Sequence, residues 1–594
     1  MVGAQDESTA DPAQVSIGEQ LFLEPRFAQY FAAHFDGNVN HPLTHGDPTV
    51  SQVQTGNGTY PSPFAGQSMN CRSCHFVDEF NGAPGMGNRT YADFTARTPI
   101  PDRGDGHTTT PRNALNMVDS SIRRPAGLFL HGDGEFSKTT TLVESTLTGR
   151  NYGWLPSEYQ QAVAHIARVI REDDGTNSLA QQYAGAYSKA LLGTAPDIPD
   201  DLRLPAEFRI DVNTATDEEI VNEVSRLVSA YIESLEFARD DEGVHAGSPY
   251  DAFLAKNDLP AVPVAGVETQ EQYSERLLRA LELLKGRDIQ YVTAADGQFQ
   301  THNQQFAFGP LELEGLKIFL AKSIESASAE PRINPALWVA AGFPCAAFVL
   351  IGWGGFRLRR HAVLAVGVAG FLCTLLVACG GGSSGSGPAA HVAAHTGNCV
   401  TCHTAPNFSD FKFHNTGASQ EEYDAVRGAG TFDALNIPDF NTRKQAPDDY
   451  LPANPLRPDG SGIFRAPASA GDVRLTDLGM WNIYANDDYP EPQAQLRALM
   501  CGNSSPCDPQ QVLDRTIGRF KTPVLRDLGH SQPYLHSGRM ATIEDVVTFY
   551  RQMSELARAG KLRNADPAIA GISMDDHDAK ALAAFLRALN EDYD

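Results

Sequence analysis

The sequence predicts a mainly α-helical protein with long irregular loops and an internal duplication. Apolar residues recur at helical spacing in several stretches, whereas the two-residue alternation typical of strands is scarce. The 37 Pro and 52 Gly residues indicate long loops. The duplication rests on Gly18-Glu-Gln-Leu-Phe22 and Gly315-Leu-Lys-Ile-Phe319, which precede two copies of one cysteine motif. The predicted helices span 160–171, 218–238, 272–286 and 578–589.

The length of the chain predicts more than one domain, and its net charge argues against one class of partner. A chain of 594 residues exceeds the size of one ordinary domain. Its net charge of -26 argues against nucleic acid as a partner, because phosphate binding requires clustered Lys and Arg. The same charge is compatible with a small basic protein partner.

The duplicated motif is Cys-x-x-Cys-His, at Cys71/Cys74/His75 and at Cys399/Cys402/His403. A single copy is also compatible with half a zinc site or a thioredoxin-like pair. Two copies, each ending in His and each preceded by a similar helix, favour covalent haem c. The thiols then reach the two vinyl groups of a haem, and the His becomes the proximal iron ligand. The motifs therefore predict two haem groups and a redox function.

The other cysteines fall into two groups. Cys501 and Cys507 flank a short polar loop, and either a disulfide between them or two free thiols is compatible with the sequence. Cys345, Cys373 and Cys379 lie in one apolar stretch. Residues 1–12 lack the apolar region of a signal peptide, although haem attachment to this motif occurs outside the bacterial cytoplasm. We therefore expect a signal upstream of the given start.

The apolar stretch predicts a transmembrane helical hairpin. Residues 336–356 and 362–378 are apolar, and the basic turn 357–360 lies between them. A membrane span needs about 20 apolar residues, and a basic turn tends to stay cytoplasmic. A hairpin keeps both haem motifs on the same side of the membrane. Two alternatives remain: a bacterial lipoprotein signal with cleavage and lipidation at Cys379, and a buried apolar hairpin.

These patterns divide the chain into four predicted parts. The N-terminal haem domain with a helical extension comprises 1–310, and the entry helix of the second haem domain comprises 311–334. The hairpin and a Gly/Ser linker comprise 335–390, and the C-terminal haem domain comprises 391–594. The predicted fold is thus mainly α, with two cytochrome c-like haem domains interrupted by a transmembrane helical hairpin.

Three C-terminal motifs point to a known family. They are Gly518-Arg-Phe-Lys-Thr-Pro523, Ser531-Gln-Pro533-Tyr-Leu-His536-Ser-Gly538 and Thr542-Ile-Glu-Asp-Val-Val-Thr-Phe-Tyr550. With the segments 397–408 and 407–417, they resemble the bacterial di-haem cytochrome c peroxidase/MauG superfamily. The resemblance covers nearly the whole chain except the apolar insertion, and its motifs are more specific after residue 397. It implies a peroxide-reactive N-terminal haem and an electron-transferring C-terminal haem.

The resemblance also suggests metal ligands. Tyr550 stands where the peroxidases place the methionine ligand of the C-terminal haem, and MauG-type enzymes have Tyr there. Tyr550 is therefore the expected ligand; the alternative is that it is a core aromatic, and Met553 is the rival axial ligand. The family holds one Ca²⁺ between the haems. Ser531 and Pro533 match positions that supply backbone carbonyls, and Asn113 is the nearest side-chain candidate, with ordinary loop hydrogen bonding as the alternative.

The first half departs from the family pattern. Phe129-Leu-His131-Gly-Asp-Gly134 stands where the family has the Trp that relays electrons between the haems. His131 or Trp154 is therefore the candidate relay, unless the haems couple directly. Glu158 lies near the expected position of the distal catalytic Glu, which would assist proton transfer during O–O cleavage. The alternative for Glu158 is a first-turn helix residue stabilised by the helix dipole.

The predicted activity is the reduction of hydrogen peroxide by a periplasm-facing di-haem oxidoreductase, with electrons from a cytochrome c or cupredoxin-type donor. One alternative is a MauG-like enzyme that oxidatively modifies a partner protein. The other is a non-catalytic electron-transfer cytochrome with both irons six-coordinate. We expect anchoring in the inner membrane through 336–378, or through a lipid at Cys379. Whether the protein forms a homodimer is left open.

Overall fold

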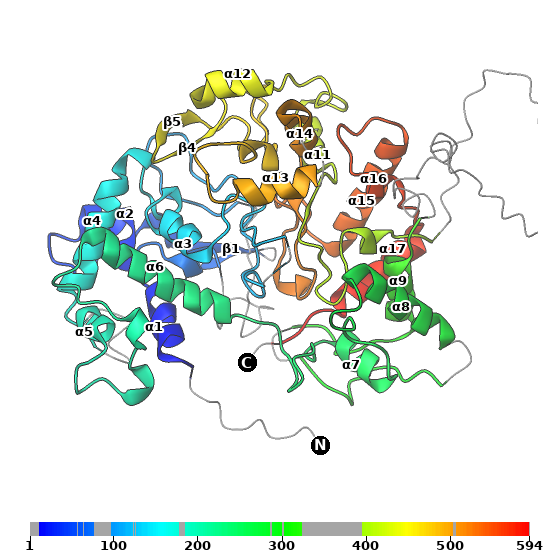
Figure 1. Cartoon of the computed structure of the whole chain (residues 1–594), viewed down its shortest axis with the longest axis horizontal. Helices are drawn as coiled ribbons and strands as arrows, with labels where there is room; N and C mark the ends of the chain where they lie inside the picture. The colour runs from blue at the N-terminus through cyan, green and yellow to red at the C-terminus, as the bar shows by residue number, and fades with distance from the viewer. Residues whose placement is uncertain are drawn as a thin grey trace, which may run out of the picture. The chain divides into compact units, whose positions relative to one another are not determined.

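The two Gly-containing helices of the predicted duplication occupy matching places in the fold. The structure, a computed structural model, describes residues 11–55, 58–62, 64–75, 97–122, 124, 126–176, 185–284, 288–299, 302–323, 395–502 and 507–592. Helix α1 (Ala13–Phe22) packs against α6 (Asp217–Ser234), and α9 (Pro310–Leu320) packs against α17 (Asp576–Arg587) (Figure 1).

Glycine is required at both helix crossings. A Cβ atom on Gly18 would lie 2.1 Å from the carbonyl oxygen of Leu227, and a Cβ on Gly315 would lie 2.0 Å from that of Ala581. No side chain fits at such a distance, so each glycine allows two helix backbones to touch. The sequence duplication is therefore also a duplication of helix packing.

The remaining helices extend these two pairs. The N-terminal half adds α2 (Gln29–His34), α3 (Thr139–Leu147), α4 (Tyr159–Glu172) and α5 (Tyr187–Leu192). The connecting region adds α7 (Pro249–Lys256) and α8 (Gln270–Leu283). The C-terminal half adds α11 (Ala418–Arg427), α12 (Phe440–Gln445), α13 (Gln493–Cys501), α14 (Pro509–Thr516), α15 (Ile543–Arg558) and α16 (Pro567–Ala570). The four helices predicted from periodicity correspond to α4, α6, α8 and α17, with ends shifted by a few residues.

Strands are few and short in the described part of the chain. They form three antiparallel pairs: β1 (Gln52–Thr55) with β2 (Gly58–Pro61), β3 (Phe413–His414) with β6 (Phe520–Lys521), and β4 (Pro452–Asn454) with β5 (Arg457–Ser461). The prediction of a mainly helical protein is confirmed.

Apolar side chains gather into separate cores around the two helix pairs. The first core contains the buried faces of α1, α3, α4 and α6, and Cys71 and Cys74 pack against it. The second contains those of α7, α8, α9 and α17, and Cys399 packs against it. A third surrounds the fully buried Trp481. Each haem motif thus lies against the core of its own helix pair.

The prediction that the fold contains a transmembrane helical hairpin is wrong. No helix in the described residues is both long enough and apolar enough to cross a bilayer. The longest described helix, α6, has 18 residues and carries three acidic residues in its first turn, whereas a span needs about 20 mostly apolar ones. The segments that suggested the hairpin, 336–356 and 362–378, lie outside the described residues, as does Cys379. Apolar composition predicted the spans, but composition alone does not specify a spanning helix.

The predicted disulfide is confirmed. Cys501 and Cys507 are bonded to each other and join the end of α13 to the start of α14. The described residues from 11 to 323 and from 395 to 592 belong to one compact unit. The four domain boundaries given above remain predictions.

Candidate cofactor-binding site

Both Cys-x-x-Cys-His motifs begin as a 3₁₀ turn, over Cys71–Ser73 and Cys399–Thr401. In each copy the turn places the backbone amide of the His close to the backbone carbonyl of the first Cys. The amide of His75 donates to the carbonyl of Cys71 at 3.0 Å, and that of His403 donates to Cys399 at 2.8 Å. The two motifs therefore share one backbone conformation.

An asparagine ties each turn to the end of the matching helix. The Asn70 side chain donates to the carbonyl of Leu23, just after α1, at 3.0 Å. At the second motif the backbone amide of Asn398 donates to the carbonyl of Ala321, just after α9, at 3.0 Å, and the Asn398 side chain accepts from the amide of Ser323 at 3.2 Å. Both asparagines directly precede the first Cys of their motif. The sequence analysis missed these residues, although their shared position was visible in it.

A cavity of about 250 Å³ opens beside the second motif. Its wall includes Cys399, Cys402 and His403 together with Tyr550 of α15. Most of the rest is apolar, including Phe319, Val524, Leu525, Val547 and Leu582. A mainly apolar cavity with a few convergent polar groups is typical of cofactor sites, and this donor set fits a haem.

His403 is arranged as a metal ligand. Its Nδ1 donates to the carbonyl oxygen of Phe408 at 2.8 Å. This tautomer leaves the lone pair of Nε2 to bind a metal, and the hydrogen bond fixes the ring. Burial lowers the pKa of His403 to about 4. The imidazole is therefore neutral at physiological pH, as an iron ligand must be.

The motif cysteines are thiols. Cys71, Cys74, Cys399 and Cys402 take no part in a disulfide. Burial raises the pKa of Cys71 to about 11, and burial together with Cys402 raises that of Cys399 to about 12. Reduced thiols are the form that thioether attachment to a haem consumes, so these residues fit the predicted group.

The two axial candidates on α15 face different surroundings. Tyr550 lines the cavity with His403, and burial raises its pKa above the ordinary value. Met553 is buried in a cluster with Ala418 and Phe549, against which Tyr550 also packs, but Met553 itself does not line the cavity. Tyr550 is therefore the better placed of the two.

The three calcium candidates line the same cavity, although Asn113 is distant in sequence from Ser531 and Pro533. Asn113, Ser531 and Pro533 all line the cavity. The Asn113 side chain contacts the Pro533 carbonyl through Nδ2, and its Oδ1 is buried without a hydrogen-bond partner. Turning the amide over would place Oδ1 next to the Pro533 oxygen. Two such oxygens repel unless a cation lies between them, so this pair fits a hard cation such as Ca²⁺.

The candidate relay residues lie in different environments. Trp154 is buried in the core beside the first motif, where its Nε1 donates to the carbonyl of Phe27 at 3.1 Å. His131 is 37% exposed, and its Nδ1 lies 2.8 Å from Glu135. Its neighbour Gly132 lines the cavity. Neither contact tests electron relay, so both assignments remain predictions.

Glu158 forms a two-point ion pair with Arg103, at 2.7 and 2.9 Å. It also accepts a hydrogen bond from the amide of Leu155 at 2.9 Å. Partial burial opposes ionisation of Glu158, but the contacts with Arg103 and Leu155 outweigh it and lower the pKa. Glu158 is thus held as a carboxylate at the start of α4, and its catalytic role remains a prediction.

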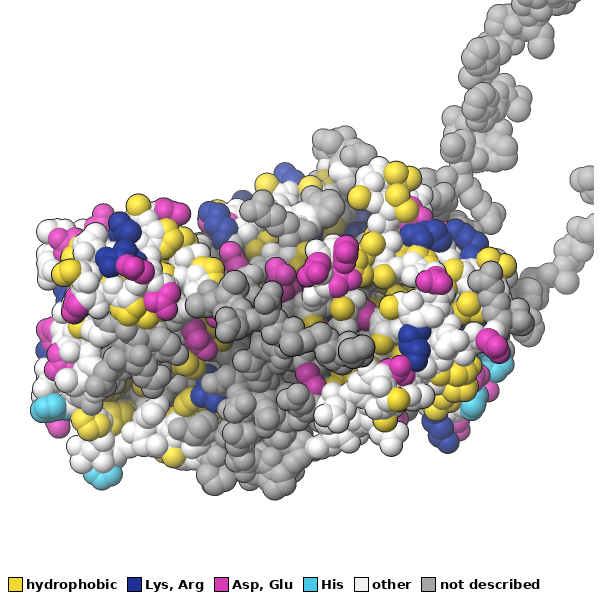
Figure 2. Space-filling view, turned by 90° about the horizontal axis from the view of Figure 1, so that it is seen from below, with side chains coloured by type: hydrophobic (Ala, Val, Ile, Leu, Met, Phe, Trp, Pro, Cys, Tyr) yellow, Lys and Arg dark blue, Asp and Glu magenta, His cyan; other side chains and the backbone are white. Residues whose placement is uncertain are grey.

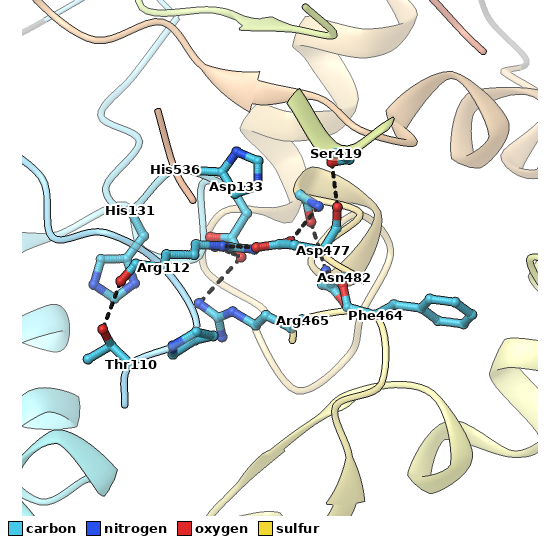
Figure 3. Close-up of polar contacts among 12 residues, drawn as sticks. Thr110, Arg112, His131, Asp133, Ser419, Phe464, Arg465, Asp477, Asn482 and His536 are labelled. Atoms are coloured by element: carbon cyan, nitrogen blue, oxygen red, sulfur yellow. Dashed lines mark hydrogen bonds and ion pairs between the residues drawn. The ribbon is translucent and has the colours of Figure 1, made fainter. Parts of the chain in front are cut away.

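A buried ionic cluster lies next to the cavity (Figure 3). Arg112 contacts Asp477 through Nη2 at 2.8 Å and Asp133 through Nη1 at 2.6 Å. Arg465 reaches Asp133 at 3.3 Å from the other side. Both carboxylates are fully buried, and the ring of His536, part of the cavity wall, lies beside this cluster in the figure. Because the arginines and carboxylates come from both halves of the chain, the cluster holds the cavity wall together.

His414, which also lines the cavity, carries a fixed positive charge. Its Nδ1 lies 2.7 Å from Asp566 and its Nε2 lies 3.0 Å from Asp410. Burial alone would lower the pKa of His414, but the two carboxylates raise it to about 12. The sequence analysis quoted the segment that contains His414 without assigning it a role.

Comparison with known proteins gives partial matches. The chain is 25% identical over 194 residues to a cytochrome-c peroxidase, IdrP2, of Pseudomonas sp. (strain SCT). The matched region covers 33% of this chain and 36% of that protein. It is also 36% identical over 76 residues to a cytochrome-c peroxidase, IdrP1, of Denitromonas iodatirespirans. This matched region covers 13% of this chain and 19% of that protein.

The comparisons confirm the resemblance to the di-haem cytochrome c peroxidase/MauG superfamily. The matched part of the chain spans about a third of the length of the IdrP2 proteins. No family model matches the chain.

Two solved structures are similar over most of their length. They are the diheme peroxidase BthA of Burkholderia thailandensis E264 and a MauG-like protein associated with microbial copper homeostasis. The first has a TM-score of 0.39 and 15% identity, covering 98% of this chain and 86% of that chain. The second has a TM-score of 0.39 and 13% identity, covering 100% of this chain and 96% of that chain. At these TM-scores the likeness carries no argument.

Proposed function

We propose that the chain is a peroxidase-like di-haem oxidoreductase that reduces hydrogen peroxide outside the cytoplasm, with electrons from a small donor protein. The observation that carries the proposal is the pair of Cys-x-x-Cys-His turns, each hydrogen-bonded to the end of a matching helix through the residue before its first Cys, by different atoms in the two copies. Similarity to cytochrome-c peroxidases supports the same reading. Bound haem iron supplies the electron transfer and the peroxide binding.

In this proposal the cysteine pairs hold two haems covalently, and His75 and His403 are the proximal ligands. The hydrogen bond from His403 to Phe408 orients the ring and selects the nitrogen that faces the metal. The apolar wall beside the second motif excludes water from the porphyrin. Tyr550, which lines the same cavity as His403, would be a second protein ligand of this haem. A phenolate oxygen there favours the ferric state more than a thioether sulphur does.

A calcium ion would be held by the Asn113 side chain and by the carbonyl oxygens of Ser531 and Pro533. The unpartnered Oδ1 of Asn113 beside Pro533 supports this assignment. Such an ion would join the segment after Arg112 to the segment before His536. It would thereby fix the N-terminal half against the wall of the second cavity.

On the N-terminal side, Glu158 would exchange protons with bound peroxide. Arg103 keeps it ionised in the absence of substrate, which suits a proton acceptor. Trp154 and His131 are the candidate relay residues between the two sites. Trp154 is buried and fixed, whereas His131 is partly exposed, so Trp154 is the better protected from solvent.

A second candidate function is oxidative modification of a partner protein, as in MauG. The specific observation that favours it is Tyr550 in the cavity wall in place of Met553. For either function the electron or protein partner would meet an acidic surface. Figure 2 shows Asp and Glu side chains grouped at several places on one face, and the net charge is -26.

The proposal is tested on protein produced in cells that attach haem c. Pyridine haemochrome spectra should show two haem c per chain, and reduced cytochrome c should be oxidised continuously on addition of hydrogen peroxide. Replacing Cys399 and Cys402 with Ala should leave one haem. Two haems without turnover, together with a covalently altered partner, would favour the second candidate. Absence of haem c would remove both.

A further inference from the structure

Two cations near the second motif form no ion pair with a carboxylate among the described residues, although the charge of Asp119 acts on one of them, Arg124. They are Lys521, on β6, and Arg124, in the loop that follows Asp119. Neither forms an ion pair of the kind that Arg112 or Arg526 makes with buried aspartates. Both are partly buried. Charged groups removed from water are normally paired, so two unpaired neighbours call for an explanation.

The position of Lys521 is fixed by its backbone. Its amide donates to the carbonyl of Gly132 at 2.7 Å, and it pairs with Phe413 across the β3–β6 ladder. The side chain lines the cavity that contains Cys399 and His403. Burial, and the nearby charge of Arg124, lower the pKa of Lys521 to about 7. The ammonium form of Lys521 is thus destabilised by burial and by the neighbouring guanidinium.

Arg124 is held equally firmly. Its guanidinium stacks on the ring of Phe411, 3.6 Å from the ring centroid, and its Nη2 donates to the carbonyl of Ser120 at 2.9 Å. Its Nε and Nη1 are buried without an acceptor. Burial lowers the pKa of Arg124 to about 10. Two preorganised N–H donors therefore point to no group of the described chain.

An anionic group bound near the second motif would be within the neighbourhood of both cations. Phe411, on which Arg124 stacks, follows Asp410, whose amide donates to the carbonyl of Cys402 at 2.8 Å. Arg124 is thus next to the second haem motif, and Lys521 is in the wall of the same cavity. A porphyrin attached through Cys399 and Cys402 brings two propionate carboxylates with it. Two carboxylates match two cations in charge, and a guanidinium edge matches a carboxylate in geometry.

We propose that Lys521 and Arg124 bind the propionates of the haem attached at Cys399 and Cys402. The inference rests on the proposed function. Both act as positioning residues: they neutralise the carboxylates and fix how the porphyrin lies in the cavity. A free oxyanion such as phosphate offers the same chemistry, and the experiment separates the two sources.

The test uses the holoprotein and its Lys521→Met, Lys521→Arg and Arg124→Met variants. Lys412→Met is the matched control, because Lys412 lies in the adjoining strand region but is exposed. Midpoint potentials are measured by redox titration, and the C-terminal haem is assigned by comparison with a variant lacking Cys399 and Cys402. Resonance Raman spectra report the propionate bending modes.

Loss of a positive charge beside the haem stabilises the ferric form. Lys521→Met should lower the ferrous-to-ferric ratio at a fixed potential by about tenfold, equivalent to about 59 mV for one electron, and should shift the propionate modes. Lys521→Arg should restore both, and Lys412→Met should change neither. Arg124→Met should act in the same direction and serves as the test if Lys521→Met does not yield folded holoprotein.

Unchanged potential and Raman modes in both Met variants would overturn the inference. So would a wild-type potential that moves with phosphate concentration at constant ionic strength and becomes insensitive in Lys521→Met, because the site would then bind a free oxyanion. These outcomes differ from failure of the proposed function, which would appear earlier as the absence of haem c in the pyridine haemochrome spectrum.

Discussion

Replacing Gly315 with Ala tests whether close helix contact holds the second haem motif. The new Cβ would lie 2.0 Å from the carbonyl oxygen and 2.5 Å from the carbonyl carbon of Ala581. These are backbone atoms, so no rotamer change relieves the overlap and α9 must move away from α17. Overpacking costs about 3 kcal/mol at the upper end of its usual range, and Ala regains about 1 kcal/mol of helix propensity over Gly. We therefore expect a net destabilisation of about 2 kcal/mol.

The displacement should reach the haem motif. The carbonyl of Ile318 on α9 accepts from the Gly397 amide at 2.9 Å, directly before the motif. Urea denaturation of the holoprotein gives the stability, and the pyridine haemochrome assay gives the haem content. Gly18→Ala should behave similarly at the first motif. Glu314→Ala, an exposed substitution on α9, is the control and should change stability by less than about 1 kcal/mol. A Gly315→Ala protein as stable as the wild type would refute the reasoning.

Three further outcomes are expected. Burial lowers the pKa of His165 from 6.5 to about 4. The folded protein therefore loses on the order of 3 kcal/mol of stability as the pH falls from 6.5 toward 4 and the buried ring must take up a proton. His165→Gln should flatten the decline in urea midpoint between pH 7 and pH 4, and an equally steep decline would contradict this. Tyr550→Phe should alter the ferric EPR signal of one haem while Met553→Leu leaves it unchanged, and the reverse pattern would exchange their roles. Replacing Cys501 and Cys507 with Ser should destabilise by about 2 kcal/mol, the loop-closure value for a ring this short; thermal melting checks this, and the variant, unlike the wild type, should be insensitive to a reductant.

Features carried by local spacing were predictable from the sequence. The motifs at Cys71 and Cys399 and the amphipathic helices depend on residues a few positions apart. The Gly18 and Gly315 repeat was visible as a pattern, and its cause, backbone contact between helices, appeared only with the partner helix in place. The Cys501–Cys507 pairing was predictable because the intervening loop is short.

Features that join distant segments were not predictable. Asn113 meets Pro533, and Arg112 meets Asp477, across separations of 420 and 365 residues. No periodicity encodes such pairs, since they arise only when the two halves pack. Family resemblance grouped Asn113 with Pro533, and the two are in contact, whereas their role as calcium ligands stays a prediction. The prediction of a transmembrane hairpin was wrong for a different reason. It rested on the apolar composition of one segment alone.

The described segments that end at Ser323 and begin at His395 contact each other close to those ends. The carbonyl of Ala321 accepts from the backbone amide of Asn398, and the side chain of Asn398 accepts from the amide of Ser323 at 3.2 Å. The end of α9 and the second Cys-x-x-Cys-His turn are therefore joined by hydrogen bonds of their own. We expect the sequence between Ser323 and His395 to be free to diverge as long as these bonds are kept.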